Sequence, residues 1–184
     1  GLGFHEYLQL CEDLEMEAMY VCNCGMSCQA RHGGGFSEET TKEYLEEALH
    51  ALEYALGSAD TPYGSLRAEN GRKEPFRLKY VEIGNENFGP EYNQRYELFY
   101  KTLKEAFPQV IYISNGHTER ENLPTDYADE HYYDAPEFFL ENGELFDDYD
   151  RNGPKIFLGE YAVNGGNTIA SMECALAEAA FLLG

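Results

Sequence analysis

Two stretches decide the fold of this chain: Val81-Glu82-Ile83-Gly84-Asn85-Glu86-Asn87 and Ile156-Phe157-Leu158-Gly159-Glu160-Tyr161-Ala162. Each is an apolar, β-branched or aromatic run that reaches glycine or asparagine and then presents a glutamate. A strand that delivers a carboxylate at its C-terminal end is typical of the active face of a barrel enzyme. We therefore expect Glu86 and Glu160 at the carboxyl ends of two different parallel strands.

Helical and strand patterns alternate on both sides of these stretches. Short apolar runs predict strands at 19–22, 80–83, 110–113 and 155–158, and Asp129 to Tyr133 is expected to be a further short strand. Helical spacing predicts helices at 3–14, from Ser37 through Leu56, at 92–107, 136–149 and 168–183, and the polar segment 61–75 is expected to be a loop. In the last helix Ile169, Met172 and Leu176 are expected to face inward.

This alternation predicts βαβ units and a parallel sheet, hence the α/β class. The strands are nearly all apolar, as expected for strands buried on both faces. An open doubly wound sheet is one alternative, but carboxylates after two different strands favour a (β/α)8 TIM barrel. Five strands cannot close an eight-stranded barrel, so the barrel is expected to be partial. Both ends of the chain look cut, and we expect an internal fragment of a longer protein.

The charge of the chain restricts its partners. Its 34 acidic and 13 basic residues give a formal net charge of −21. Such a surface repels phosphate backbones and anionic lipid, so we expect no nucleic-acid partner and no membrane partner. No stretch approaches the ~20 apolar residues of a membrane span. The compartment is left open.

The cysteines indicate neither a disulfide framework nor a metal site. The chain has five, an odd number without regular spacing. Cys22, Cys24 and Cys28 lack the paired C-x2-C halves of zinc sites. Cys22 and Cys24 fall at the end of an apolar run, where we expect small buried hydrophobes.

A pair of strand-end carboxylates suits glycosidic bond cleavage, in which one protonates the leaving oxygen and the other meets the developing cation. Each residue also has a structural interpretation. Glu86 is a candidate cap for the helix that follows, and Glu160 a candidate buried salt-bridge partner. Asn85 is a candidate turn residue. His131 and Tyr133 alternate on one strand, so both should face the same side, where core residues also lie.

The sequence resembles the α-L-arabinofuranosidases of glycoside hydrolase family 51. The residues that carry this resemblance run in order along nearly the whole chain: Gly3 to Leu14, Tyr80 to Asn87, Asp129 to Tyr133, Gly159 to Val163, and Ala175 to Phe181. Members of the family have a (β/α)8 barrel followed by a β-sandwich, and they act with retention. The resemblance implies that 1–184 is one fragment of the catalytic barrel, about strands three to seven, without the C-terminal β-sandwich.

The resemblance also implies roles for individual residues. Glu86, after the fourth barrel strand, would be the acid/base, and Glu160, after the seventh, the nucleophile. Asn85 would bind the sugar 2-hydroxyl. His131 and Tyr133, on the sixth strand, would line the site, with the tyrosine hydroxyl orienting the nucleophile.

Substrates implied by the resemblance are terminal α-L-arabinofuranosyl groups of arabinoxylan, arabinan or their oligosaccharides, with no metal and no organic cofactor. Many family members carry Trp where this chain has Phe88, which we expect to stack on a sugar. Two alternatives stay open: another retaining glycosidase of the same barrel clan, such as a β-xylosidase or endoglucanase, and a non-catalytic carbohydrate-binding remnant. A homo-oligomer of the full-length protein also stays open. We expect residues 1–184 alone to be inactive on an aryl arabinofuranoside or poorly folded, because the missing barrel strands leave the edges of the first and last strands exposed.

Overall fold

The computed structural model of the protein describes residues 1–31, 33–116, 123–164 and 170–183. The chain divides into two compact units, Gly1–Tyr127 and Ala128–Gly184.

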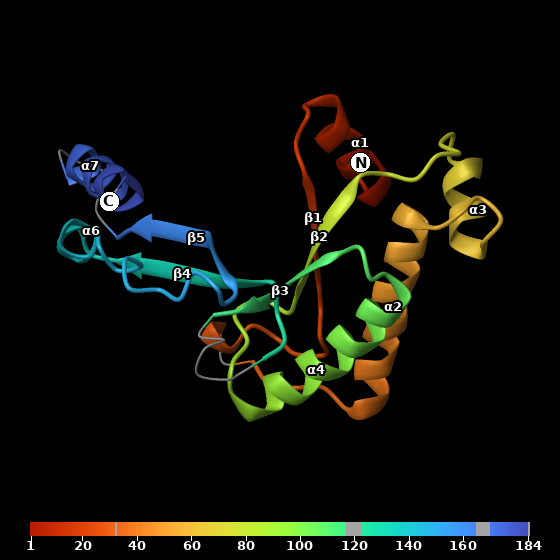
Figure 1. The fold of residues 1–184 in the computed structure, drawn as a ribbon, viewed down its shortest axis with the longest axis horizontal. Coiled ribbons are helices and arrows are strands. Elements are labelled where there is room, and N and C mark those ends of the chain that lie inside the picture. The colour runs from red at the N-terminus through yellow and green to blue at the C-terminus, as the bar shows by residue number, and fades with distance from the viewer. Residues whose placement is uncertain (32, 117–122, 165–169, 184) are drawn as a thin grey trace. The chain divides into compact units, whose positions relative to one another are not determined.

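Unit 1 is a three-stranded parallel sheet with helices between the strands (Figure 1). Its elements are α1 (Phe4–Asp13), β1 (Ala18–Cys22), the 3-10 helix η1 (Gln29–Arg31), α2 (Glu38–Leu56), α3 (Pro62–Glu69), β2 (Leu78–Ile83), α4 (Gly89–Ala106) and β3 (Ile111–Asn115). The strands lie in chain order, with Val21 opposite Glu82 and Glu82 opposite Ile113. An unbroken chain order is typical of a barrel, whereas a doubly wound sheet reverses its order at a switch point.

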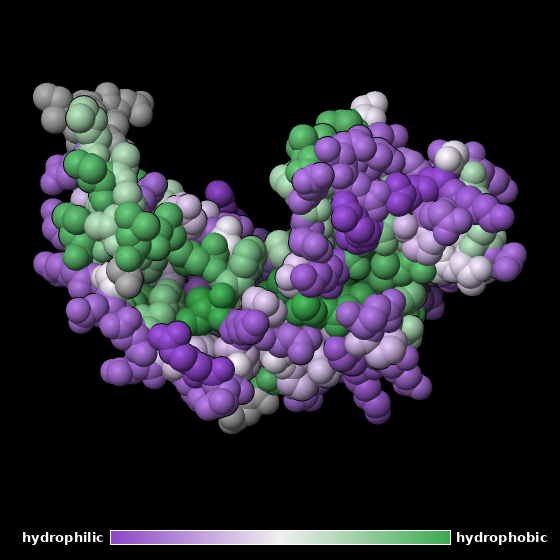
Figure 2. All heavy atoms as spheres, turned by 45° about the horizontal axis from the view of Figure 1, so that its top comes forward, coloured by the Kyte–Doolittle hydropathy of each residue, from purple (hydrophilic) through white to green (hydrophobic). Residues whose placement is uncertain are grey.

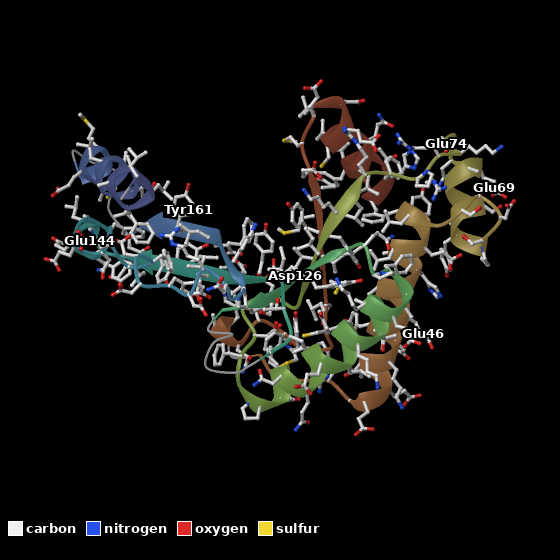
Figure 3. All side chains as sticks on the ribbon, viewed as in Figure 1. Glu46, Glu69, Glu74, Asp126, Glu144 and Tyr161 are labelled. Atoms are coloured by element: carbon white, nitrogen blue, oxygen red, sulfur yellow. The ribbon has the colours of Figure 1, made fainter. Side chains whose placement is uncertain are left out.

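The core of unit 1 lies between the sheet and its two long helices, α2 and α4, which pack against each other. Leucines at helical spacing, such as Leu45 and Leu52, direct one face of α2 inward, and α4 contributes Tyr96 and Phe99. Ser37 begins α2 as its N-cap, because its hydroxyl accepts the backbone N–H of Thr40. The acidic side chains of α2 are exposed, apart from the half-buried Glu53, and Glu46 extends away from the helix in Figure 3.

Unit 2 contains β4 (Tyr127–Asp134, whose first residue ends unit 1), α6 (Pro136–Glu141), β5 (Lys155–Val163) and α7 (Ala170–Leu183). β4 and β5 are neighbours and run in the same direction (Figure 1). A small core of Phe139, Ala177 and Phe181 joins α6 to α7. Among the described residues, no helix of either unit is long and apolar enough to cross a membrane.

The structure corrects the prediction that residues 61–75 form a loop, because α3 occupies Pro62–Glu69. Thr61 is its N-cap, and Pro62 stands at its first turn, where a missing N–H does no harm. Arg67 is fully buried and donates to the carbonyl oxygens of Tyr54 and Lys73 at 2.7 and 2.8 Å. The signal was missed because the buried side of this short helix is polar.

Two further predictions are wrong. The helix expected at 136–149 ends at Glu141, since the Asn142 side chain donates to the carbonyl of Phe138 and the chain continues in turns.

In α7 the expected inward residues Met172 and Leu176 are 71% and 67% exposed, and Cys174, Ala177 and Phe181 are buried instead. Apolar residues lie on both the buried and the exposed sides of this helix, so its periodicity did not identify the packed face. Hydrophobic residues accordingly gather on the surface of this part of unit 2 in Figure 2. Ile169 lies outside the described residues.

Candidate active site

The loop from β2 to α4 is a tight turn that carries Asn85 and Glu86. Backbone φ is positive at Gly84 (82°), at Glu86 (51°) and at Gly89 (84°). Glycine adopts this left-handed region freely, whereas a residue with a Cβ pays roughly 1–2 kcal/mol for it. A strained non-glycine residue at a strand end is a recurrent feature of functional sites, because the surrounding structure must hold it there.

Asn87 provides much of the support for this turn. It is 2% exposed, and its side chain accepts the backbone N–H of Asn85 and donates to the carbonyl of Ser27 at 2.8 Å. Its own backbone N–H donates to the Asn115 side chain at the end of β3, and Asn115 also donates to Glu82 at 2.7 Å. Buried polar groups that are paired in this way rigidify the backbone around them.

The carboxylate of Glu86 accepts a hydrogen bond from the thiol of Cys28, with Sγ 2.7 Å from Oε2. The interpretation of Glu86 as a helix cap is wrong, since Phe88 is the N-cap residue of α4. Phe88 is 60% exposed, and Asn85 is exposed as well. A cavity of about 290 Å³ lies at the carboxyl ends of β1 and β2 and is lined by Val21, Cys22, Asn23, Met26, Ser27, Cys28, Gly84, Asn85 and Asn87.

Cys22 and Cys24 are buried in the core of unit 1, as expected for small hydrophobes, and burial raises the pKa of Cys24 to about 12. All five cysteines of the chain lie in its described part and are free thiols.

In unit 2, Glu160 lies within β5, because this strand continues beyond the expected end at 158 to Val163. The Tyr133 hydroxyl on β4 donates to Oε2 of Glu160 at 2.7 Å, and Nδ1 of His131 lies 3.6 Å from the same oxygen. His131 and Tyr133 therefore share the face of β4 that meets Glu160. The Glu160 side chain is 38% exposed, so the interpretation of a buried ion-pair carboxylate does not fit.

Asp129 connects β4 and β5 behind Glu160. It is buried, its Oδ2 lies 2.7 Å from Nε2 of His131, and its Oδ1 accepts the backbone N–H of Gly159 at 2.9 Å. A carboxylate on one imidazole nitrogen fixes the orientation of the ring. Asp129 therefore holds both His131 and the backbone next to Glu160.

Sequence reasoning missed Cys28, Asn87 and Asp129. Asn87 and Asp129 stand inside the stretches already singled out, and the alternation of β4 would have placed Asp129 on the face of His131. No local signal identifies Cys28, because its contact with Glu86 joins two loops 58 residues apart. Glu86 belongs to unit 1 and Glu160 to unit 2, and the separation of their carboxylates stays a prediction.

Parallel strands in chain order, with a carboxylate at or near the carboxyl end of a strand in each unit, are typical of a (β/α) barrel domain. A family model described as the alpha-L-arabinofuranosidase 1 domain matches residues 1–151. The chain belongs to this family.

Curated relatives and solved structures agree with this family membership. Over its whole length the chain is 40% identical to alpha-L-arabinofuranosidase 1 of Arabidopsis thaliana and 34% identical to an extracellular exo-alpha-L-arabinofuranosidase of Streptomyces chartreusis. It spans 27% and 23% of the lengths of these two proteins. An arabinose-bound α-L-arabinofuranosidase of glycoside hydrolase family 51 matches 96% of this chain with 32% identity and a TM-score of 0.85, and 31% of that structure is covered. The resemblance to family 51 and the partial (β/α)8 barrel are confirmed.

Proposed function

We propose that the protein containing this chain is an α-L-arabinofuranosidase that releases terminal arabinofuranosyl groups with retention of configuration. Membership of the family supports the activity, and so do the names of the relatives, each of which is an α-L-arabinofuranosidase. The observation that carries the proposal is the environment of Glu160, whose Oε2 accepts the Tyr133 hydroxyl and faces His131.

In the proposed mechanism Glu160 attacks the anomeric carbon while Glu86 protonates the leaving oxygen, giving a covalent glycosyl-enzyme. Water then attacks the same carbon, Glu86 accepts its proton, and Glu160 leaves as a carboxylate. The hydrogen bond from Tyr133 orients one oxygen of Glu160, so that the other is directed to the sugar, and it stabilises the carboxylate when it departs. Retention requires a carboxyl separation of ~5–5.5 Å.

Asn85 is proposed to bind the sugar 2-hydroxyl, since its side chain is exposed beside the cavity at the end of β2. An exposed ring such as Phe88 offers an apolar face for a sugar. The proposed substrates are arabinoxylan, arabinan and arabino-oligosaccharides.

The test uses the full-length protein and its Glu160→Ala and Glu86→Ala variants. Glu160→Ala should abolish turnover of 4-nitrophenyl α-L-arabinofuranoside, and retained turnover would remove Glu160 from the nucleophile role. Glu86→Ala should lose activity mainly on substrates with poor leaving groups, and azide should partly restore turnover of activated ones. NMR of the first-formed product reports its configuration, and an inverted product contradicts the proposal. Faster hydrolysis of the matching xyloside or glucoside would favour another member of the barrel clan.

A further inference from the structure

The segment Ser27–Gln29 contacts the turn that carries Glu86 at each of three successive residues. The Ser27 carbonyl accepts the Asn87 side chain, and the Cys28 thiol donates to Glu86. The Gln29 backbone N–H donates to the Glu86 carbonyl at 3.1 Å, and the Gln29 side chain accepts the backbone N–H of Phe88 at 2.6 Å. Four hydrogen bonds thus join two loops that begin at the ends of β1 and β2.

This segment is itself closed by Gly33. The backbone N–H of Gly33 donates to the Cys28 carbonyl at 3.1 Å. A Cβ on Gly33 would lie 2.3 Å from Cβ of Ser27 and 2.7 Å from that carbonyl oxygen. Only glycine allows so close an approach, so the loop backs directly onto the residues that contact the turn.

We propose that Ser27–Gln29 is a clamp on the Glu86 turn, and that Cys28 and Gln29 are positioning residues that fix the Glu86 carboxyl group for proton transfer. The proposal rests on the acid/base role proposed above. The Gln29 backbone N–H holds the carbonyl of Glu86, whose backbone lies in the strained left-handed region, and the Gln29 side chain holds the backbone of Phe88 two residues on. The Cys28 thiol holds the side chain of Glu86.

The thiol also distinguishes the two carboxyl oxygens of Glu86. It has one proton, which it donates to Oε2, so Oε1 carries the transferable proton when Glu86 is protonated. This hydrogen bond raises the pKa of the Cys28 thiol above its ordinary value, and burial adds to the effect. The thiol therefore stays protonated, and remains a donor, at neutral pH.

The test measures kcat/KM of the full-length protein and of its Cys28→Ala and Cys28→Ser variants on two substrates that differ in their leaving group. A misplaced acid matters most when the leaving group needs a proton, so Cys28→Ala should lower kcat/KM on methyl α-L-arabinofuranoside about tenfold. On the 4-nitrophenyl substrate kcat/KM should change by about twofold at most. Cys28→Ser keeps a hydrogen-bond donor and should therefore retain most of the kcat/KM on methyl α-L-arabinofuranoside that Cys28→Ala loses. Cys11→Ala, the same change on α1, is the control and should leave both values unchanged.

An equal loss on both substrates, or no loss on either, would overturn the clamp. If Cys28→Ala does not fold, the same comparison of kcat/KM on the two substrates is made with Gln29→Ala. Failure of the clamp can be told apart from failure of the proposed function. If Glu86→Ala shows no leaving-group dependence, the acid/base role itself is wrong. If Glu86→Ala shows it and the clamp variants do not, only the clamp is wrong.

Discussion

Gly159→Ala should destabilise the protein by forcing apart the contact between β4 and β5 that supports Glu160. A Cβ at position 159 would lie 2.2 Å from Oδ1 and 2.8 Å from Cγ of Asp129. Real Cβ atoms do not approach heavy atoms so closely, so the buried carboxylate has to move. It then loses its hydrogen bond to the Gly159 backbone and its contact with His131.

The loss in free energy of unfolding is estimated from the overpacking at position 159 and from the lost hydrogen bond of Asp129. Overpacking a tight site costs about 1–3 kcal/mol, and a hydrogen bond to a charged group contributes about 1.5–3 kcal/mol. Partial relaxation recovers some of their sum, so we expect Gly159→Ala to lower the free energy of unfolding by about 2–4 kcal/mol. Urea denaturation followed by near-UV circular dichroism measures it.

Gly34→Ala is the matched control, since a Cβ there meets no atom of the described residues within 4 Å. It should change the free energy of unfolding by less than about 0.5 kcal/mol. In an Asp129→Ala background the obstructing carboxylate is gone, and Gly159→Ala should then cost less than about 1 kcal/mol. A Gly159→Ala variant as stable as the wild type, or a cost that is the same in both backgrounds, would refute the reasoning.

Three further predictions concern unit 1. Arg67→Met should lower the free energy of unfolding by about 3–5 kcal/mol in denaturation experiments, because it leaves buried carbonyl oxygens without donors; a loss below about 1 kcal/mol contradicts this account. Thr61→Ala removes the N-cap of α3 and should cost about 1 kcal/mol, and Thr61→Ser should recover most of it. Burial raises the pKa of Tyr20 from 10 to about 12, so the stability linked to its proton is complete below pH 10 and is lost as pH rises toward 12. Tyr20→Phe should therefore unfold at higher pH than the wild type in an alkaline titration, and an unchanged midpoint would assign the alkaline loss to other groups.

Strong local patterns were enough to predict most of the fold. β2 was identified from a short apolar run that is followed by glycine, and α2 from leucines at helical spacing. The pattern was insufficient where the buried surface has unusual chemistry. α3 packs Arg67 instead of an apolar side chain, and α7 has apolar residues on both its buried and its exposed sides.

Some residues of the candidate site could likewise be predicted from local patterns, and others could not. Glu86 and Glu160 stand out because they follow apolar runs, and the alternation of β4 correctly placed His131 and Tyr133 on one face. The groups that hold them are harder to see. Cys28 reaches Glu86 from a distant loop, and such a contact depends on tertiary structure that no local period encodes.

The left-handed backbone of Glu86 implies that a glutamate at this position lowers the stability of the protein. Glycine or asparagine would occupy the same turn without the Cβ conflict, and either would remove the carboxyl group. Selection for stability alone would therefore favour replacement of residue 86, and the more stable protein would lack the proposed acid/base. A stabilisation programme on this protein should keep residue 86 fixed and seek its gains elsewhere.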